Sequence, residues 1–457
     1  MRHLIAAIDL GTTKVVCAVG EKTPAGIKII AHSQAPSKGV LRGEVINIQH
    51  VLDSMLPVVN EVENAIGHKI NEVFVGIAGQ NIRCATNASQ TTRRQPEELI
   101  TQEEIDTITS DMYGTFVQNG EKVLHVIPQS YNIDDFMGIT EPVGMIGQQI
   151  NANFKLFIGK SNSAQFSNNV ISRAGLKLRE LVLEPLASAK AVLSEDECEV
   201  GVAMLDIGGG TSDLLIIQDN IIRHAAVIPF GGNSVTEDIR MGCGISSKHA
   251  EQLKVQYGSC FSASAPKNTI VIPGIGGRES REISFKVLAN IIEARMAEIF
   301  EAVDFEIEKS GYKNLLQAGL VITGGSAQML NICQLASTVT GLEARVAYPD
   351  ESIVSDSISE VYSPAQATAV GLVLKGFEKM AREKTVYNTA TPIKYDIYKV
   401  ECSAGIPQLT LLKSFDSKSG VYERMIRIKN KYYLVSTVSI DVLNSNFDII
   451  ETINYLG

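Results

Sequence analysis

The 457-residue sequence lacks tryptophan, and it also lacks the features that mark nucleic-acid-binding, disulfide-linked or membrane-spanning proteins. Its 41 basic and 51 acidic residues give a formal net charge of -10, and the lysines and arginines are not clustered, so nonspecific nucleic-acid binding is disfavoured. The seven cysteines are scattered without a CxxC pair, which argues against a zinc site and a disulfide framework. No apolar run reaches the ~18 residues of a membrane span, and the one at the start is too short for a signal peptide. We therefore expect a cytoplasmic protein.

Two common nucleotide-binding motifs are missing as well. Neither GxxxxGK[ST] nor a GxGxxG within a βαβ unit is found, which sets aside P-loop and Rossmann folds. The seven histidines have no metal-ligand spacing such as HExxH, so no metal is assigned to them. With 45% hydrophobic and 20% charged residues, the composition is that of a globular protein, and the length favours two or more domains.

Two glycine-rich hairpins are the strongest signal in the sequence. The segment from Leu4 to Val19 consists of two apolar runs, LIAAID and VVCAVG, around the turn GTTK. The segment from Gly201 to Ile217, GVAMLDIGGGTSDLLII, repeats this plan much later in the chain. The repeat indicates an internal duplication.

Each hairpin has the chemistry of a phosphate and metal site. Glycine lets the backbone approach a ligand, successive N–H groups form an anion cradle, and threonine hydroxyls add donors. A carboxylate at a strand end can hold Mg²⁺ through waters, a role that we assign to Asp9 and Asp206. A purely structural turn is an even alternative for one hairpin alone, and two copies favour phosphate binding. The predicted phosphate-binding residues are Gly11, Thr12, Thr13, Lys14, Gly208, Gly209, Gly210 and Thr211.

Three further places are candidates for the rest of a nucleotide site. The run from Leu320 to Met329 reads as a strand, a Gly-Gly turn and a helix start, which suits the α-phosphate and sugar, although a routine turn also fits. Glu251 and Lys254 share a helical face and could bind ribose or base, with an exposed ion pair as the favoured alternative. Glu184 could orient an attacking water or be a solvated carboxylate at a helix start.

Two segments rich in small residues, EPLASAKAVL from Glu184 and SPAQATAVGLVL from Ser363, each predict a helix led by proline. Alanine, serine and glycine would let these helices cross closely at a hinge between two lobes, with ordinary core helices as the alternative. Thr101 followed by Glu104 predicts the start of another helix.

Together, the paired hairpins, the proline-led helices and the TGG turn, formed by Thr323, Gly324 and Gly325, resemble the actin, Hsp70 and sugar-kinase superfamily. Within it, the run from Val123 to Gly159 is similar to the inserted domain of FtsA, a family of actin-like bacterial cell-division proteins. The segments GVLRGEVINIQHV, LVLEPLASAKAVLS, LDIGGGTSDLLI and HAAVIPFGGNSVTEDI resemble that family too. The resemblance covers about residues 1 to 378 and implies an α/β, actin-like, duplicated ribonuclease-H-like two-lobe ATPase fold.

The resemblance also implies a division into subdomains. The expected ranges are 1A at 1–82 and 164–198, 1C at 83–163, 2A at 199–229 and 304–379, 2B at 230–303, and a linker with a β-rich tail at 380–457. The family usually ends in a basic amphipathic helix that lies on the membrane. Here the last segment carries Asp448 and Glu451, which anionic lipid would repel, so we expect strands and not a membrane helix.

The function that the resemblance implies is nucleotide-dependent and structural. ATP and Mg²⁺ would bind in the cleft, with Gly232, Asn233, Glu251 and Lys254 in the purine and ribose wall, and Gly324, Gly325 and Ser326 at the adenosine. The family forms filaments, links FtsZ to the cytoplasmic face of the inner membrane at the septum through the FtsZ C-terminal peptide, and recruits later divisome proteins. Hydrolysis would be slow at most, with nucleotide acting as a switch. The alternatives are a small-molecule kinase of the superfamily and a pilus-assembly actin homologue.

Overall fold

The computed structural model describes residues 3–24, 26–272, 280–351, 354 and 357–389, and then the backbone of six strands between 394 and 454. Two compact units are present, one at 4–376 and one that begins at Phe377. Each is described by itself.

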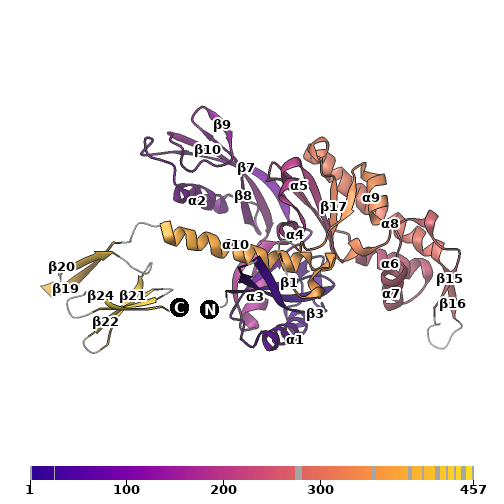
Figure 1. The fold of residues 1–457 in the computed structure, drawn as a ribbon, viewed down its shortest axis with the longest axis horizontal. Coiled ribbons are helices and arrows are strands. Elements are labelled where there is room, and N and C mark those ends of the chain that lie inside the picture. Colours follow the sequence, from indigo (N-terminus) through magenta and orange to yellow (C-terminus); the bar gives the residue numbers. More distant parts are fainter. Residues whose placement is uncertain are drawn as a thin grey trace. The chain divides into compact units, whose positions relative to one another are not determined.

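Two five-stranded sheets with the same strand order form the centre of the larger unit (Figure 1). In the first, β11-β6-β1-β2-β3, the pairs among β1, β2 and β3 are antiparallel and those among β1, β6 and β11 are parallel. The second, β14-β13-β12-β17-β18, has the same directions. This common topology confirms the duplicated actin-like fold. The strands are β1 (Leu4–Leu10), β2 (Lys14–Thr23), β3 (Gly26–Pro36), β6 (Glu72–Ile77), β11 (Lys177–Leu183), β12 (Val202–Ile207), β13 (Ser212–Gln218), β14 (Ile221–Ile228), β17 (Leu320–Thr323) and β18 (Ala344–Val346).

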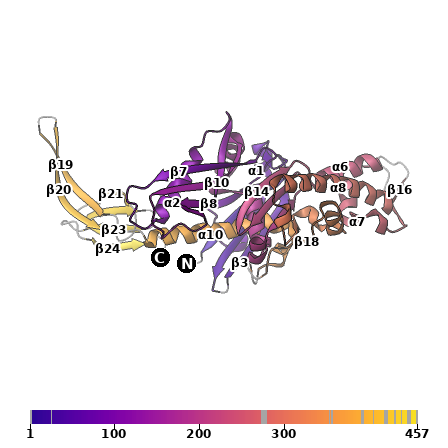
Figure 2. The same cartoon turned by 90° about the horizontal axis from the view of Figure 1, so that it is seen from above.

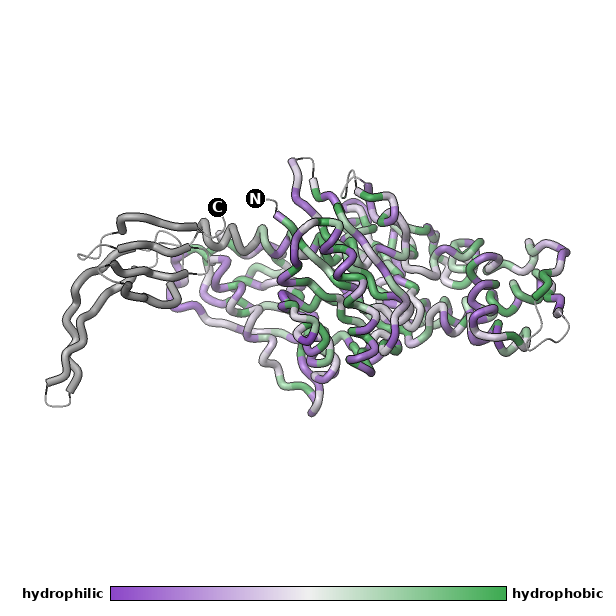
Figure 3. The backbone as a smooth tube through the Cα atoms, turned by 90° about the horizontal axis from the view of Figure 1, so that it is seen from below, coloured by the Kyte–Doolittle hydropathy of each residue, from purple (hydrophilic) through white to green (hydrophobic). Residues whose placement is uncertain are grey.

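The strands that carry the two hairpins are apolar on both faces because both faces of each sheet are covered. Every residue of β12 is buried, and apolar stretches follow the central strands in Figure 3. Helix α1 (Ile48–Ile66) packs Met55 against the first sheet, and α8 (Phe285–Ser310) packs Phe300 against the second. The strand ends are therefore held rigidly, which fixes the turns that follow them.

The two proline-led helices form and cross as expected. They are α4 (Glu184–Val192) and α10 (Ala367–Thr389), the latter preceded by the short turn η7 (Pro364–Gln366). A Cβ on Gly371 would lie 1.8 Å from the carbonyl oxygen of Ala187, so the two backbones are in contact at the crossing. Only glycine allows this approach.

A separate four-stranded sheet is inserted after β6 of the first five-stranded sheet. Its order is β7-β10-β8-β9, and the helix predicted from Thr101 and Glu104 begins there with both hydrogen bonds of a capping box. Figure 2 shows this part at one end of the larger unit, with α6, α7 and β16 at the other end. Its elements are β7 (Arg83–Thr92), α2 (Gln102–Asp111), η1 (Met112–Gly114), β8 (Glu121–Ile133), β9 (Phe136–Ile139) and β10 (Gln149–Lys160).

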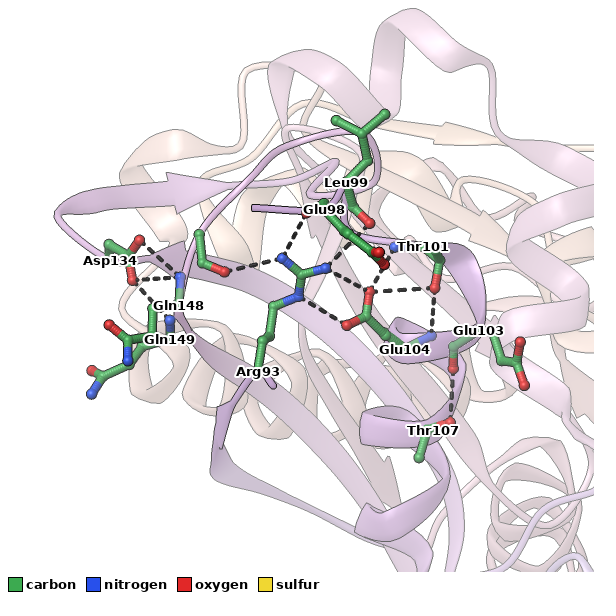
Figure 4. Close-up of polar contacts among 11 residues, drawn as sticks. Arg93, Glu98, Leu99, Thr101, Glu103, Glu104, Thr107, Asp134, Gln148 and Gln149 are labelled. Carbon is green, nitrogen blue, oxygen red and sulfur yellow. Dashed lines mark hydrogen bonds and ion pairs between the residues drawn. The ribbon is translucent and has the colours of Figure 1, made fainter. Parts of the chain in front are cut away.

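One buried arginine, Arg93, holds the loops of this inserted sheet together (Figure 4). Its guanidinium donates to both carboxylate oxygens of Glu104, at 2.8 and 3.2 Å, and to the backbone carbonyls of Glu98, Leu99 and Gly147. Arginine suits this position because its planar donors can satisfy several acceptors at once. The network joins the start of α2 to loops on both sides of it.

The remaining elements of the larger unit pack against the first or the second sheet, or connect the two. Helix α8 extends beyond 303, where the expected 2B range ends; the numerical limits of the subdomains stay a prediction. These elements are β4 (Val40–Leu41), β5 (Glu44–Val45), α3 (Ser161–Arg173), α5 (Glu195–Val200), α6 (Gly232–Cys243), α7 (Ser247–Tyr257), η2 (Ser262–Ser264), β15 (Thr269–Ile272), β16 (Arg281–Ser284), η4 (Lys313–Leu315), η5 (Gly325–Gln328), α9 (Ile332–Thr340) and η6 (Ser359–Val361).

The C-terminal unit is β-rich, as expected. Its strands form the sheets β19-β20 and β21-β22-β23-β24, and the last segment contributes a strand and not a helix. Where a polar linker was expected from Met380, α10 continues to Thr389. Among the described residues, no helix is long and apolar enough to cross a membrane. The strands are β19 (Lys394–Ser403), β20 (Ile406–Asp416), β21 (Tyr422–Ile428), β22 (Lys431–Ser436), β23 (Ser439–Leu443) and β24 (Ile449–Asn454).

Candidate functional site

A cavity of about 490 Å³ lies between the two phosphate hairpins, a size typical of small-molecule and cofactor sites. Every residue predicted to bind phosphate, metal, sugar or base lines it, although their roles toward a ligand stay predictions. These residues are Asp9, Gly11, Thr12, Thr13, Lys14, Glu184, Asp206, Gly208, Gly209, Gly210, Thr211, Gly232, Asn233, Glu251, Lys254, Gly324, Gly325 and Ser326.

The turn of the first hairpin is shaped by backbone contacts. Asp9 is buried near the end of β1, and Lys14 begins β2 on the other side of the turn. A Cβ on Gly11 would lie 2.9 Å from the carbonyl oxygen of Lys14, so a larger residue would force this turn open. The turn thus places a carboxylate and an ammonium group at one end of the cavity.

The second hairpin is fixed by the crossing helices. Asp206 Oδ2 accepts hydrogen bonds from Ser188 Oγ of α4 at 2.6 Å and from Thr368 Oγ1 of α10 at 3.2 Å. The backbone N–H groups of Gly232 and Asn233 donate to the carbonyls of Gly208 and Gly209, which ties the start of α6 to the turn. Two helices that are distant in sequence therefore orient one carboxylate.

The two hairpin turns approach each other closely across the cavity. A Cβ on Gly209 would lie 1.8 Å from Thr13 Oγ1, and one on Gly210 would lie 2.6 Å from Thr12 Oγ1. Both threonine hydroxyls thus face the glycine turn of the opposite hairpin. Such a pair of bare turns with hydroxyl donors can grip a polyphosphate from both sides.

Buried carboxylates dominate the electrostatics of the phosphate end. Burial raises the pKa of Asp9 to about 6, with Lys14 opposing the shift and Asp206 adding to it. Burial and the charge of Asp206 raise the pKa of Asp213 to about 7. Burial, together with the charges of Asp9, Asp213 and Asp206, raises the pKa of Glu184 well above its usual range. A bound cation would favour the ionised form of all of them.

These residues fit a hydrated Mg²⁺. Asp213 is 4% exposed, and its Oδ1 has no hydrogen-bond partner in the described part of the chain, whereas its Oδ2 accepts from Thr211 Oγ1 at 3.1 Å. A metal-bound water could donate to that orphaned oxygen, as Mg²⁺ keeps several waters when it binds proteins. Among the described residues, no group of three or more His, Cys, Asp or Glu is arranged to hold a metal directly.

Glu184 lies inside the cavity at the start of α4. A Cβ on Gly76 of β6 would lie 2.9 Å from Glu184 Cγ, so this glycine makes room for the carboxylate. Glu184 is half-buried, and burial together with the neighbouring carboxylates raises its pKa well above the usual range. Its position is compatible with the predicted water-orienting role.

The other end of the cavity has a mixed lining suited to a nucleoside. Glu251 and Lys254 form an ion pair at 2.8 Å, as the alternative interpretation expected, yet both also line the cavity. Lys254 Nζ further donates to the Gly232 carbonyl at 3.0 Å. Apolar surface, which a base could contact, comes from Val255, Met329 and Leu330.

The TGG turn has a backbone conformation that favours glycine at Gly324. Gly324 has φ of 89°, and a Cβ there would lie 2.3 Å from Asp206 Oδ1. Ser326 Oγ donates to the Gly208 carbonyl at 3.2 Å. The turn therefore packs directly on the second phosphate hairpin, and it leaves no space for a side chain at this glycine.

Several residues that line or support the cavity were not assigned from the sequence. Asp213 lies within the second hairpin as the second residue of β13, and its position just after the glycine turn is the signal that the sequence offers for it. Ser188 and Thr368 were seen only as small helix residues. Val255, beside Lys254, and Gly43 carried no local signal.

Comparisons with known proteins point to one family. A family model described as "Cell division protein FtsA" matches residues 203–371, and one described as "SHS2 domain inserted in FTSA" matches residues 79–158. The chain is 35% identical over 380 residues to a cell division protein FtsA of Pseudomonas aeruginosa, covering 83% of this chain and 90% of that protein. It is 37% identical over 376 residues to that of Neisseria meningitidis, with 81% and 90% covered.

Solved structures share the fold at low sequence identity. The chain is similar to a protein of a PilM–PilN type IV pilus biogenesis complex, with a TM-score of 0.57, 14% identity, and 81% of this chain and 98% of that chain covered. It is also similar to MreB5 of Spiroplasma citri bound to ADP, with a TM-score of 0.51, 16% identity, and 84% and 98% covered. These likenesses concern the fold alone.

Proposed function

The chain belongs to the FtsA family of cell division proteins, and from this premise we propose that it is an ATP-binding, actin-like adaptor of the division machinery. The observation that carries the proposal is the cavity between the two duplicated hairpins, which gathers every predicted nucleotide residue. In this proposal the turns at Gly11–Lys14 and Gly208–Thr211 bind phosphates, and the wall formed by α7 and the TGG turn binds adenosine.

Asp9 and Asp206 would hold Mg²⁺ through waters, and the metal would neutralise phosphate charge when bound. Ser188 and Thr368 orient Asp206 by their hydrogen bonds. Glu184 would accept a proton from, and so orient, a water near the terminal phosphate. We propose that hydrolysis is slow at most and that nucleotide mainly biases the relative position of the lobes.

A binding experiment tests the nucleotide site. Calorimetric titration of the full chain with Mg-ATP should show binding, and Asp206→Asn should weaken it about 10-fold or more, because a charged partner of the metal is lost. Asp219→Asn is the matched control, since Asp219 lies in an exposed turn at φ of 55°, which asparagine also adopts. Unchanged affinity in Asp206→Asn would refute the metal assignment.

The family further supports a role between FtsZ and the membrane. We propose that the chain self-associates into filaments, binds the C-terminal peptide of FtsZ, recruits later divisome membrane proteins and acts on the cytoplasmic face of the inner membrane at the division site. A small-molecule kinase or a pilus-assembly role is less well supported, because relatives that are 33 to 37% identical over most of the chain are division proteins.

Lipid contact is the least typical part of this proposal, because β24 lies where the family usually has a basic amphipathic membrane helix. Sedimentation with anionic vesicles and FtsZ C-terminal peptide should show three-way association of the full chain, with and without ATP. A deletion of 390–457, which keeps α10 whole, tests where attachment resides. Persistent sedimentation of the deletion variant would assign lipid contact to the larger unit.

A further inference from the structure

A two-residue turn, Arg42-Gly43, joins β4 to β5 beside the nucleotide cavity. Val40 pairs with Val45 across this hairpin, and φ is 48° at Arg42 and 75° at Gly43. Two positive φ angles are the signature of a type I′ turn, whose first position favours asparagine, aspartate or glycine. An arginine with positive φ has a strained backbone conformation, and residues with such conformations concentrate at functional sites.

This turn touches both phosphate hairpins. The backbone N–H of Gly43 donates to Thr12 Oγ1 of the first hairpin at 3.0 Å. A Cβ on Gly210 of the second hairpin would lie 3.0 Å from the Cα of Arg42. The turn therefore lies against the contact between Thr12 and Gly210, where the phosphate turns of the two lobes meet.

Arg42 lines a second cavity, of about 290 Å³, which adjoins the first. Gly43 lines the first cavity, so the two turn residues stand at the boundary between them. The residues that both cavities share all belong to the predicted phosphate and purine set. They are Thr12, Gly209, Gly210 and Asn233.

The charges around the second cavity leave Arg42 available for an anion. The carboxylates on its far wall are already paired, Glu237 with Arg240 and Asp238 with Arg295. The Arg42 guanidinium donates to the neutral amide oxygen of Gln80 at 3.1 Å and has no carboxylate partner among the described residues. Exchanging the Gln80 amide oxygen for a phosphate oxygen would strengthen the hydrogen bond of Arg42, because hydrogen bonds between two charged groups are stronger than those to a neutral acceptor.

The phosphate end of the first cavity also needs more positive charge. Asp9, Glu184, Asp206 and Asp213 line it, and Lys14 is the cation that opposes them there. A triphosphate adds further negative charge at its terminal group. Arg42 is placed to supply a second cation from outside, across the shared wall at Thr12 and Gly210.

We propose that Arg42 binds the terminal phosphate of ATP and thereby makes this cleft distinguish nucleoside triphosphate from diphosphate. The inference rests on the proposed function, because it requires ATP in the cavity. Arginine's planar donors match phosphate oxygens in a bidentate manner, which lysine cannot reproduce. Because the same turn touches both hairpins, the contact couples the terminal phosphate to closure of the lobes.

The test measures affinities of the full-length chain for Mg-ADP and for the Mg complex of a non-hydrolysable ATP analogue. Arg42→Asn suits it, because asparagine favours the type I′ turn and keeps the hairpin while removing the guanidinium. We expect about 10-fold or greater loss for the triphosphate, with Mg-ADP affinity changed less than about twofold. The affinity of Arg42→Lys for the triphosphate should lie between those of the unaltered chain and of Arg42→Asn. Arg94→Asn, which removes an exposed arginine of the inserted domain, should change neither affinity.

Equal weakening of both nucleotides in Arg42→Asn, or no weakening of either, would overturn the role of Arg42 and leave the proposed function standing. Retained Mg-ADP affinity shows that the variant is folded. If the unaltered chain binds neither nucleotide, the proposed function falls together with this inference.

Discussion

At Gly371 the backbones of α4 and α10, the two helices that cross between the lobes, are in contact. A Cβ there would lie 1.8 Å from the carbonyl oxygen of Ala187 and 2.3 Å from its carbonyl carbon. These are backbone atoms of α4 and cannot rotate away as a side chain could. Gly371→Ala must therefore move the two helices apart.

The magnitude follows from two opposing effects. Overpacking a rigid contact costs about 3 kcal/mol at the upper end of its usual range. Alanine is better than glycine in a helix interior by about 1 kcal/mol. We therefore expect the free energy of unfolding to fall by about 2 kcal/mol in Gly371→Ala.

Gly242→Ala in α6 is the matched control. A Cβ at Gly242 would lie 2.7 Å from Ile291 Cδ1, the free end of a side chain that can change rotamer. The helix-propensity gain then faces little opposition, and stability should stay level or rise by up to about 1 kcal/mol. Urea unfolding of both variants gives the comparison.

The crossing also affects the nucleotide site. Ser188 on α4 and Thr368 on α10 both donate to Asp206, so separation of the helices lengthens at least one of these hydrogen bonds. We expect Gly371→Ala to weaken Mg-ATP binding under conditions in which the variant is fully folded, while Gly242→Ala leaves it unchanged. If Gly371→Ala were as stable as the unaltered chain and bound nucleotide equally well, the crossing would not constrain the site.

Two further predictions concern buried charges. Arg93→Lys should lower the free energy of unfolding of the inserted domain by about 2 to 3 kcal/mol, because lysine cannot satisfy the Glu104 carboxylate and three backbone carbonyls together. The control is Arg83→Lys, which alters an exposed ion pair and should have little effect. Equal effects of the two substitutions in urea unfolding would refute the stabilising role of the Arg93 network. Without nucleotide or metal, stability should fall as pH rises from about 4 to about 7, because the folded chain retains a proton on Asp213, whose pKa is raised to about 7, after the unfolded chain has lost it. Asp213→Asn should reduce this slope in denaturation measured across that range, and an unchanged slope would exclude Asp213 as its source.

The sequence predicts those parts of the site that are built from local segments. The turns at Gly11–Lys14 and Gly208–Thr211 are each defined by residues adjacent in the chain, and both strands of each hairpin are marked by apolar runs. The capping box at Thr101 is equally local, since both of its hydrogen bonds join residues three apart. Such features are visible without knowledge of tertiary packing.

The residues that were missed depend on contacts between distant segments. Thr368 bonds to Asp206 although 162 positions separate them, and the crossing of α10 with α4 brings them together. The Arg42-Gly43 turn reaches both phosphate hairpins only through tertiary contacts. For Glu251 and Lys254, helical spacing predicted the ion pair but could not place that pair on the wall of a cavity.

The charge arrangement gives a physical reason for nucleotide to act as a switch. Three buried carboxylates, of Asp9, Asp206 and Asp213, and the half-buried Glu184 surround one lysine at the meeting point of the lobes. Burial raises the pKa of all four carboxyl groups. Closing the lobes over these groups without a cation is opposed by desolvation and mutual repulsion. Mg²⁺ would relieve this repulsion, and the terminal phosphate would add a partner for the Arg42 turn. Metal and triphosphate together would then favour the closed state over the open one, and a ligand shifts such an equilibrium only through this difference in affinity.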